Sequence, residues 1–366
     1  MSPLSNLFSA GCDVLRVDIA EAAEQMGLGG PVDGRTRRTP DLGTLPPMII
    51  IGSEALASGV LTPYALRANY RRMFPGVYAP KHAELTLWDR CEAAFLWSGR
   101  QGVISGAAAS ALHGARWVDA DAVIDLNHGN NRAPKGIMTR QERLLDDEVV
   151  LIEGVRVTSV ERTAFDLARY ECVADSVARM DALARATNFK VDDVLELSER
   201  HPGAPGRLWV PDILDLMDPG AESMQESRWR MRILAGGFRR PETQVPLLKP
   251  DGYSWYFLDM GWTDAKVAAE YDGEQHRTDD RQYTGDVRRS EFIERQYRRV
   301  RIVKGDQPAD VYRRLEAAGL RPTCEPPAIL TQTRGVWAPR EKNRATRRSR
   351  TEKIRYSAGH DGDSDG

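Results

Sequence analysis

The sequence has few cysteines and no arrangement of them that suggests a metal site. Its 366 residues contain no C-x-x-C pair and no cysteine/histidine ligand spacing. We therefore expect neither zinc ligation nor a structural disulfide. We expect the thiols to be reduced, as in a reducing compartment. The four thiols are those of Cys12, Cys91, Cys172 and Cys324.

Long apolar runs are also missing. No stretch reaches the roughly 18 apolar residues of a membrane span, and the N-terminus has no basic region followed by a hydrophobic one. We therefore expect no membrane association and a cytoplasmic location. The nucleophile elbow G-x-S-x-G, the phosphate loop G-x-x-x-x-G-K-[ST] and the dinucleotide motif G-x-G-x-x-G do not occur, which argues against the enzyme classes that depend on them.

The charge is nearly balanced but unevenly distributed. The net charge is −2, while residues 1–220 carry 23 basic and 30 acidic groups. A uniformly cationic surface for nucleic acid is excluded, so any contact with phosphate has to be local. One local excess of positive charge lies between Glu54 and Glu84, where all the charged groups are basic: Arg67, Arg71, Arg72 and Lys81.

The chain length and its turn signals predict several domains in a combined α/β and α+β architecture. Residues 1–46 are rich in Gly, Pro and Arg and are expected to form a flexible segment. Residues 47–82 predict a winged helix-turn-helix. There Thr62 and Pro63 begin a helix through LTPYALRANYRR, and MFPGVYAP follows as a wing hairpin. We expect Arg67, Arg71 and Arg72 of this module to contact DNA phosphates, although they could equally serve only to solvate a helix.

The rest of the chain divides at residues 220 and 320. Helical and strand patterns alternate over 83–220 and predict an α+β middle domain. Residues 221–320 predict one α/β domain, with a long helix over 279–299. Residues 321–366 form a basic tail that we expect to be disordered, because it has too little apolar surface to offset its ordering entropy.

A predicted hairpin in the 221–320 domain gathers acidic residues. If its turn is centred on residues 264–265, Asp259 lies opposite Glu270, and Asp272 projects from the same face by the period of two. Opposed like charges between apolar flanks need compensation, which a divalent cation would supply. Oxygen-only ligands favour Mg²⁺, or a similar ion such as Mn²⁺. His276 follows closely enough to move a proton or stabilise charge at phosphate, or it could simply cap the next helix.

These residues carry a resemblance to a nuclease family. The stretch DMGWTDAKVAAEYDGEQHR resembles the D-x(about 10)-E-x-D-G-x-x-H signature of proteins related to the very-short-patch-repair (Vsr) endonuclease, within the PD-(D/E)XK restriction-endonuclease-like superfamily. SMQESRWRMRIL is similar to the first helix of that domain, in which a glutamate, here Glu226, turns toward the site. The resemblance covers about residues 221–320.

The resemblance implies a sheet flanked by helices and a metal-dependent DNA endonuclease or nickase. Asp259 and Glu270 would hold the metal, with Glu226 as an auxiliary ligand or orienting group. Asp272 stands where the superfamily usually has a lysine, so a second metal, His276 or Asp272 itself would have to replace the ammonium. Without the resemblance, Asp259, Glu270 and Asp272 also fit a solvated sheet face that ends in an ordinary turn. Glu226 also fits an exposed helix carboxylate paired with Arg230.

A second resemblance covers about residues 48–200. LTPYALRANYRRMFPGVYAP, GVISGAAASALHGA and VRVTSVERTAFDLAR resemble the AbiEi-type antitoxin module, which has an N-terminal winged helix and often precedes nuclease-like domains. It implies an alternative function: a DNA-binding, antitoxin-like transcriptional regulator with an inactive nuclease-like domain. DNA is the expected partner under both readings, together with a repair partner or a toxin.

Overall fold

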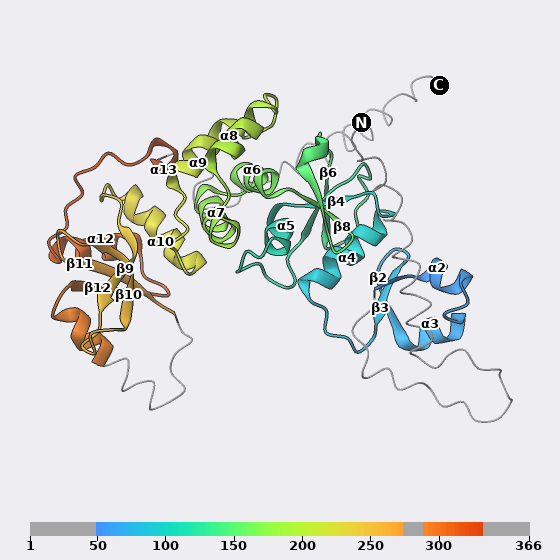
Figure 1. Ribbon diagram of the computed structural model, residues 1–366, viewed down its shortest axis with the longest axis horizontal. Coiled ribbons are helices and arrows are strands. Elements are labelled where there is room, and N and C mark those ends of the chain that lie inside the picture. The colour runs from blue at the N-terminus through green and yellow to red at the C-terminus, as the bar shows by residue number, and fades with distance from the viewer. Residues whose placement is uncertain (1–48, 274–287, 332–366) are drawn as a thin grey trace, which may run out of the picture. The chain divides into compact units, whose positions relative to one another are not determined.

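The computed structural model describes residues 49–273 and 288–331, and these form a mixed α/β structure with three β-sheets (Figure 1). The chain divides into two compact units. Unit 1 comprises the described residues up to Leu112 and Val118–Ser159, and unit 2 comprises His113–Trp117 and the described residues from Val160 onward. No helix in the described ranges is long and apolar enough to cross a membrane.

Unit 1 begins with a small antiparallel sheet in the order β1-β3-β2. The predicted helix start is confirmed, because the Thr62 hydroxyl accepts a hydrogen bond from the Ala65 amide at 3.1 Å and Pro63 is the first helical residue. The predicted hairpin is also present, with Gly76 at φ +80° in its turn. The elements are β1 (Ile50–Ile51), α2 (Gly52–Ala57), α3 (Pro63–Asn69), β2 (Tyr70–Phe74) and β3 (Val77–Pro80).

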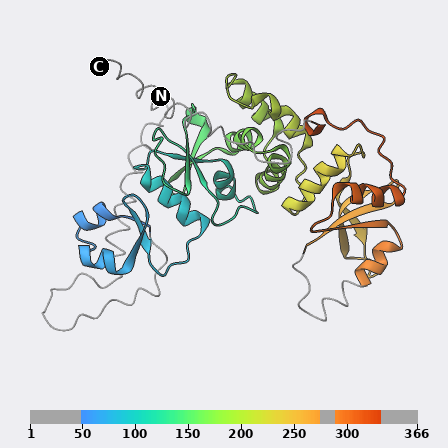
Figure 2. The ribbon, with the colours of Figure 1, turned by 180° about the vertical axis from the view of Figure 1, so that it is seen from behind.

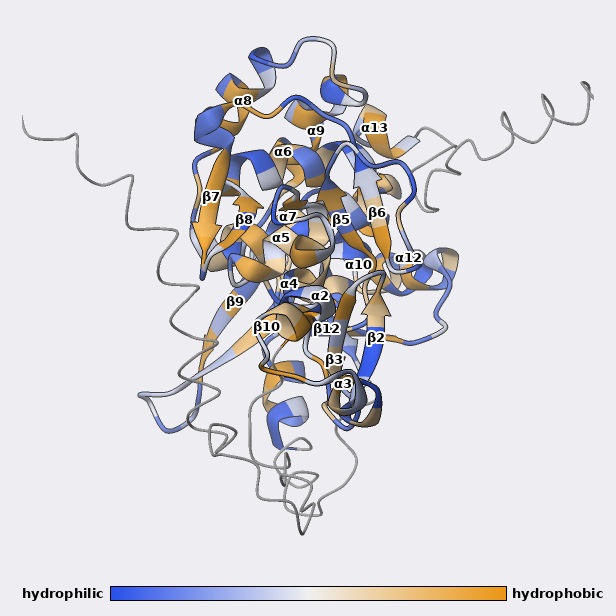
Figure 3. Ribbon diagram, turned by 90° about the vertical axis from the view of Figure 1, so that its right-hand side faces the viewer, coloured by the Kyte–Doolittle hydropathy of each residue, from blue (hydrophilic) through white to orange (hydrophobic). Residues whose placement is uncertain are grey.

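The predicted extension of this helix to residue 72 is wrong. α3 ends at Asn69, and Arg71 and Arg72 lie on β2, which Figure 3 shows as hydrophilic over part of its length. The strand buries Tyr70 and Phe74, which are 7% and 6% exposed, and pairs with β3. Long-range strand pairing and core packing therefore override the local helix preference.

The second part of unit 1 is a five-stranded sheet in the order β6-β5-β4-β8-β7. β4 runs parallel to β8 and β5 parallel to β6, while the other neighbours are antiparallel. One apolar cluster joins this sheet, α4 and the small sheet, so the two parts share a core. The elements are α4 (Leu87–Trp97), β4 (Val103–Ser105), α5 (Gly106–Leu112), β5 (Ile124–Asn127), β6 (Ile137–Arg140), β7 (Val149–Ile152) and β8 (Val155–Thr158).

Unit 2 starts with a group of helices around a second apolar cluster (Figure 2). Helix α7 packs against α6 and α9, and also against α10 from the following α/β part. Ile329 and Leu330 of α13 are buried in the same cluster, so ordered structure continues past the predicted boundary at residue 320. The elements are α6 (Val160–Tyr170), α7 (Val173–Thr187), α8 (Val191–Glu199), α9 (Val210–Leu216) and α13 (Ala328–Thr331).

The α/β part of unit 2 contains a four-stranded sheet in the order β12-β11-β10-β9, in which β11 and β12 are parallel. One apolar cluster packs α10 and α12 on the sheet, and another packs helical residues 288–294 on it. The predicted helix over 279–299 is wrong at its end, because residue 298 already begins β12; residues 279–287 lie outside the described ranges. The elements are α10 (Met224–Ala235), β9 (Glu242–Leu248), β10 (Trp255–Trp262), β11 (Val267–Asp272), β12 (Arg298–Val303) and α12 (Pro308–Ala317).

Candidate functional site

The β10–β11 hairpin has the register that the sequence predicts. Met260 pairs with Ala269 and Trp262 with Val267. The same register, carried one residue further, places Asp259 opposite Glu270. Alternation along β11 then puts Glu270 and Asp272 on one face.

The two strands separate where Asp259 lies. The β10–β11 pairing stops after Met260 and Ala269, while β11 continues to pair with β12 as far as Asp272. The Tyr271 amide, which has left the β10 ladder, donates instead to Oδ2 of Asp259 at 2.8 Å. A side-chain carboxylate thus replaces a backbone acceptor and is held in the opening between the strands.

Strand β10 is also irregular at this residue. Leu258 and Met260 are both fully buried, but they belong to different apolar clusters, whereas a regular strand would place them on one face. Gln244 of β9 falls opposite Asp259 in the strand register and has φ +49°. The local backbone distortion therefore centres on Asp259, as is common where a strand directs a side chain into a site.

The carboxylate of Asp259 is influenced by those of Glu226 and Glu270. Burial raises the pKa of Asp259 to about 7, and the charges of Glu226 and Glu270 add to this. The Tyr271 amide and Arg289 act in the opposite direction but do not cancel the effect. Burial likewise raises the pKa of Glu226. Of the four acidic site residues that the sequence selects, Glu226 and Glu270 therefore act electrostatically on Asp259.

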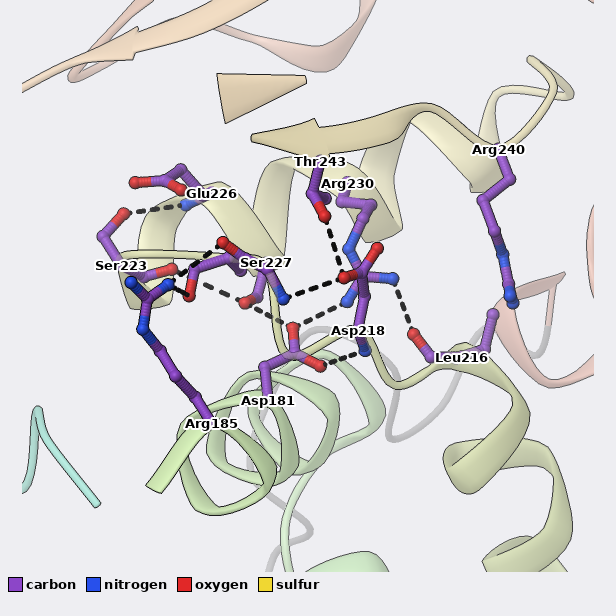
Figure 4. A network of polar contacts seen from close by, with 12 residues as sticks. Asp181, Arg185, Leu216, Asp218, Ser223, Glu226, Ser227, Arg230, Arg240 and Thr243 are labelled. Carbon is purple, nitrogen blue, oxygen red and sulfur yellow. Dashed lines mark hydrogen bonds and ion pairs between the residues drawn. The ribbon is translucent and has the colours of Figure 1, made fainter. Parts of the chain in front are cut away.

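Glu226 is fixed at the beginning of α10 (Figure 4). Its amide donates to the hydroxyl of the N-cap residue Ser223 at 3.1 Å, and its Oε2 accepts from the Glu222 amide at 2.8 Å. Glu226 is 9% exposed. The alternative of an exposed carboxylate paired with Arg230 is thus wrong, because Arg230 pairs with Asp181 of α7 at 2.6 Å.

Glu270 is held by two arginines that sequence reasoning missed. Nη2 of Arg289 lies 2.8 Å from Oε1 of Glu270, and Nη1 of Arg299 lies 3.0 Å from Oε2. Nη2 of Arg289 also donates to the Phe257 carbonyl at 3.0 Å. These guanidinium groups provide, for Glu270, the compensation that the sequence assigns to a divalent cation.

The remaining predicted residues lie in other parts of the chain. Asp272 is exposed at the end of β11, and His276 lies outside the described residues. Arg67, Arg71 and Arg72 are exposed on α3 and β2 of unit 1. Over residues 49–273 and 288–331, no group of three or more His, Cys, Asp or Glu side chains is arranged to hold a metal ion.

Comparison with known proteins gives relatives without a described activity. Two uncharacterized proteins of Mycobacterium tuberculosis, one from strain CDC 1551 and one from strain H37Rv, are each 27% identical to the chain over 202 residues. The match covers 55% of this chain and 73% of each relative. No protein-family model matches the chain, and no solved structure does.

Proposed function

We propose that this protein is a metal-dependent DNA endonuclease or nickase that hydrolyses phosphodiester bonds. The observation that carries the proposal is the position of Asp259 where β10 and β11 separate, held by the Tyr271 amide and within electrostatic reach of Glu226 and Glu270. Carboxylates kept close together away from solvent are a costly arrangement that folds retain mainly at functional sites.

The order of elements around the cluster supports a restriction-endonuclease-like domain. A helix carrying Glu226 is followed by three antiparallel strands carrying Asp259 and Glu270, and then by a strand that is parallel to β11. Helices pack on the sheet in two separate apolar clusters. The resemblance to the PD-(D/E)XK superfamily implies a sheet flanked by helices, and this arrangement is compatible with it.

The donor set suits a hard cation such as Mg²⁺ or Mn²⁺, because it consists of carboxylate oxygens. Asp259 and Glu270 would hold the ion, with Glu226 assisting. When bound, such an ion activates a water molecule and stabilises the departing oxygen. Asp259 has to lose its proton to act as a ligand, and Glu270 has to share its oxygens with Arg289 and Arg299.

Positive charge near the cluster comes from arginines rather than from the usual lysine. Arg289 and Arg299 contact Glu270 directly, and Asp272 occupies the lysine position. The partly exposed guanidinium group of Arg289 is suited to hold a phosphate oxygen, whereas that of Arg299 is buried and paired with both Glu270 and Glu294. Asp272 and His276 remain our candidates for proton transfer, and Arg67, Arg71 and Arg72 of unit 1 for DNA docking.

The test is cleavage of supercoiled plasmid with Mg²⁺ or Mn²⁺. We expect nicking by the wild type and a loss of at least about 100-fold in Asp259→Ala and Glu270→Ala, which is about 2.7 kcal/mol of transition-state stabilisation. Asp264→Asn is the matched control, because Asp264 is an exposed carboxylate of the same hairpin that pairs with Arg239 instead. Wild-type cleavage rates in both alanine variants would remove the assignment.

One observation favours the second candidate, an antitoxin-like regulator with an inactive nuclease-like domain. Both oxygens of Glu270 are already bound by arginines, so Glu270 has its countercharge without a cation. The exposed arginines of unit 1 would then be the functional surface. Sequence-preferring DNA binding without nicking in either metal ion would support this alternative.

A further inference from the structure

Unit 1 contains a cavity of about 260 Å³ that none of the functions discussed above uses. Its walls come from β1, α2 and β2 of the small sheet region, from α4, and from the β7–β8 turn. The apolar core that joins these parts is therefore incomplete at this point. A molecule bound here would contact both parts of the unit.

Most of the lining is apolar. Ile51, Val60, Leu61, Phe95 and Leu96 contribute hydrocarbon surface from three different segments of the chain. The volume is sufficient for one fused aromatic ring system with a short side chain. Cavities of this kind bind ligands through a buried apolar body and a few placed polar groups.

The polar group without a partner is Glu92. It lines the cavity from α4 and makes no hydrogen bond or ion pair with any described residue. Its neighbour Asp89 is occupied, because Oδ2 of Asp89 accepts from the Thr86 amide and hydroxyl at 2.7 Å each. Burial, followed by the charge of Asp89, raises the pKa of Glu92 to about 7. Glu92 is thus a half-buried carboxyl group that faces an apolar space.

The other charges around the cavity do not neutralise Glu92. Arg100 is engaged by Glu54 through two contacts of 2.7 Å. Glu153, in the β7–β8 turn, adds a second carboxylate at the exposed rim. The lining therefore carries an excess of negative charge once the Arg100–Glu54 pair is set aside.

We propose that this cavity binds a small apolar molecule that carries a protonated amine. The ammonium would pair with Glu92, and the apolar body would fill the space against Phe95 and Leu61. An anion would meet repulsion from Glu92 and Glu153, and a neutral hydrocarbon would leave the Glu92 carboxylate without a partner in a less hydrated setting. The proposal is independent of the nuclease site, which lies in unit 2.

The experiment is isothermal titration of the full-length protein with tryptamine at pH 8, where Glu92 is ionised. Indole-3-propionate and 3-methylindole serve as the anionic and neutral probes. We expect tryptamine to bind at least tenfold more tightly than either. Failure of tryptamine to bind, or equal binding of indole-3-propionate, would overturn the proposal.

Two variants, Glu92→Gln and Val60→Trp, test whether the ligand binds in this cavity, and Glu153→Gln is their control. Glu92→Gln keeps the shape of the side chain and should weaken tryptamine at least tenfold, whereas Glu153→Gln at the exposed rim should weaken it less than threefold. Val60→Trp, at a partly exposed loop position, should fill the cavity and abolish binding of all three probes. Thermal melting of each variant reports whether it is folded. Unchanged tryptamine affinity in folded Glu92→Gln or folded Val60→Trp would place the binding elsewhere and refute the inference.

Discussion

Asp259 has too little positive charge around it to stay ionised easily at neutral pH. Its pKa is raised to about 7 by burial, then by Glu226, while the Tyr271 amide and Arg289 only partly offset this. The folded protein therefore holds a proton that the unfolded chain, with an ordinary aspartate, releases near pH 4. Between about pH 4 and pH 7 the folded state binds more protons than the unfolded state. The contribution of Asp259 to the free energy of unfolding therefore falls as the pH rises through this range.

We expect Asp259→Asn to be more stable than the wild type at pH 8 by about 4 kcal/mol, because the pKa of Asp259 is raised from 3.8 to about 7 and each pKa unit corresponds to about 1.4 kcal/mol. The difference should shrink as the pH falls and disappear below about pH 4, where both states of the wild type are protonated. Urea unfolding at pH values from 4 to 8 measures it. Asp272→Asn, which removes an exposed carboxylate from the same hairpin, is the control for the loss of one negative charge. A constant difference for Asp259→Asn would show that Asp259 ionises normally.

The surroundings of Asp259 show which contacts the sequence predicts and which it does not. The opposition of Asp259 and Glu270 follows from turn position and strand periodicity, which are local properties. Arg289 and Arg299 reach Glu270 from segments 19 and 29 residues away, through the packing of helical residues 288–294 and the parallel pairing of β12. No local pattern fixes such contacts. The sequence therefore does not predict compensation of Glu270 by arginine, and a cation is the compensation that its local pattern favours.

At the scale of elements, the contact between α7 and α10 depends on a buried ion pair (Figure 4). Arg230 is fully buried, and its Nη2 and Nη1 donate to Asp181 and to the Leu216 carbonyl at 2.6 Å each. Asp181 also accepts from the Ser227 hydroxyl and the Asp218 amide. The network ties the helix that carries Glu226 to the helical part of unit 2, so it positions one member of the carboxylate cluster.

We expect Arg230→Met to destabilise the protein by about 3–5 kcal/mol, because it leaves the Asp181 carboxylate buried without its countercharge. The double variant with Asp181→Leu should be less destabilised than the single one, since both charges are then gone. Arg228→Met is the control: Arg228 lies on the same helix but pairs with Asp175 at a half-exposed position, and its loss should cost about 1 kcal/mol or less. Urea unfolding compares the three. Equal losses for Arg228→Met and Arg230→Met would contradict the role of the network.

The two ends of helix α3 also differ in whether local sequence signals predict them. The start of α3 follows from Thr62 and Pro63, whose effects act within one helical turn. Its end does not follow from local signals, because Tyr70 leaves the helix to pair with β3 and to enter the core of unit 1. A helix cap can be predicted from residues that are neighbours in the sequence. The competition between helix extension and strand pairing is decided by residues that become neighbours only after folding.

At the scale of the whole molecule, the proposed DNA contacts and the carboxylate cluster belong to different units. Arg67, Arg71 and Arg72 are in unit 1, and Asp259 is in unit 2. Each arginine that meets a phosphate releases counterions, so its loss makes the affinity less dependent on salt. Changes at the carboxylate cluster remove no such contact. The two functions should therefore be separable by mutation.

We expect the triple variant Arg67→Ala, Arg71→Ala and Arg72→Ala to bind DNA more weakly and to lower the slope of log affinity against log salt by up to about 2.7, or about 0.9 for each phosphate contact. Asp259→Ala should keep the wild-type slope. Arg132→Ala, an exposed arginine on the other part of unit 1, is the matched control. Fluorescence anisotropy with a labelled duplex over a salt series gives the slopes. If the triple variant kept the wild-type slope, the exposed arginines of α3 and β2 would not be the phosphate contacts, and DNA docking would have to be sought on unit 2.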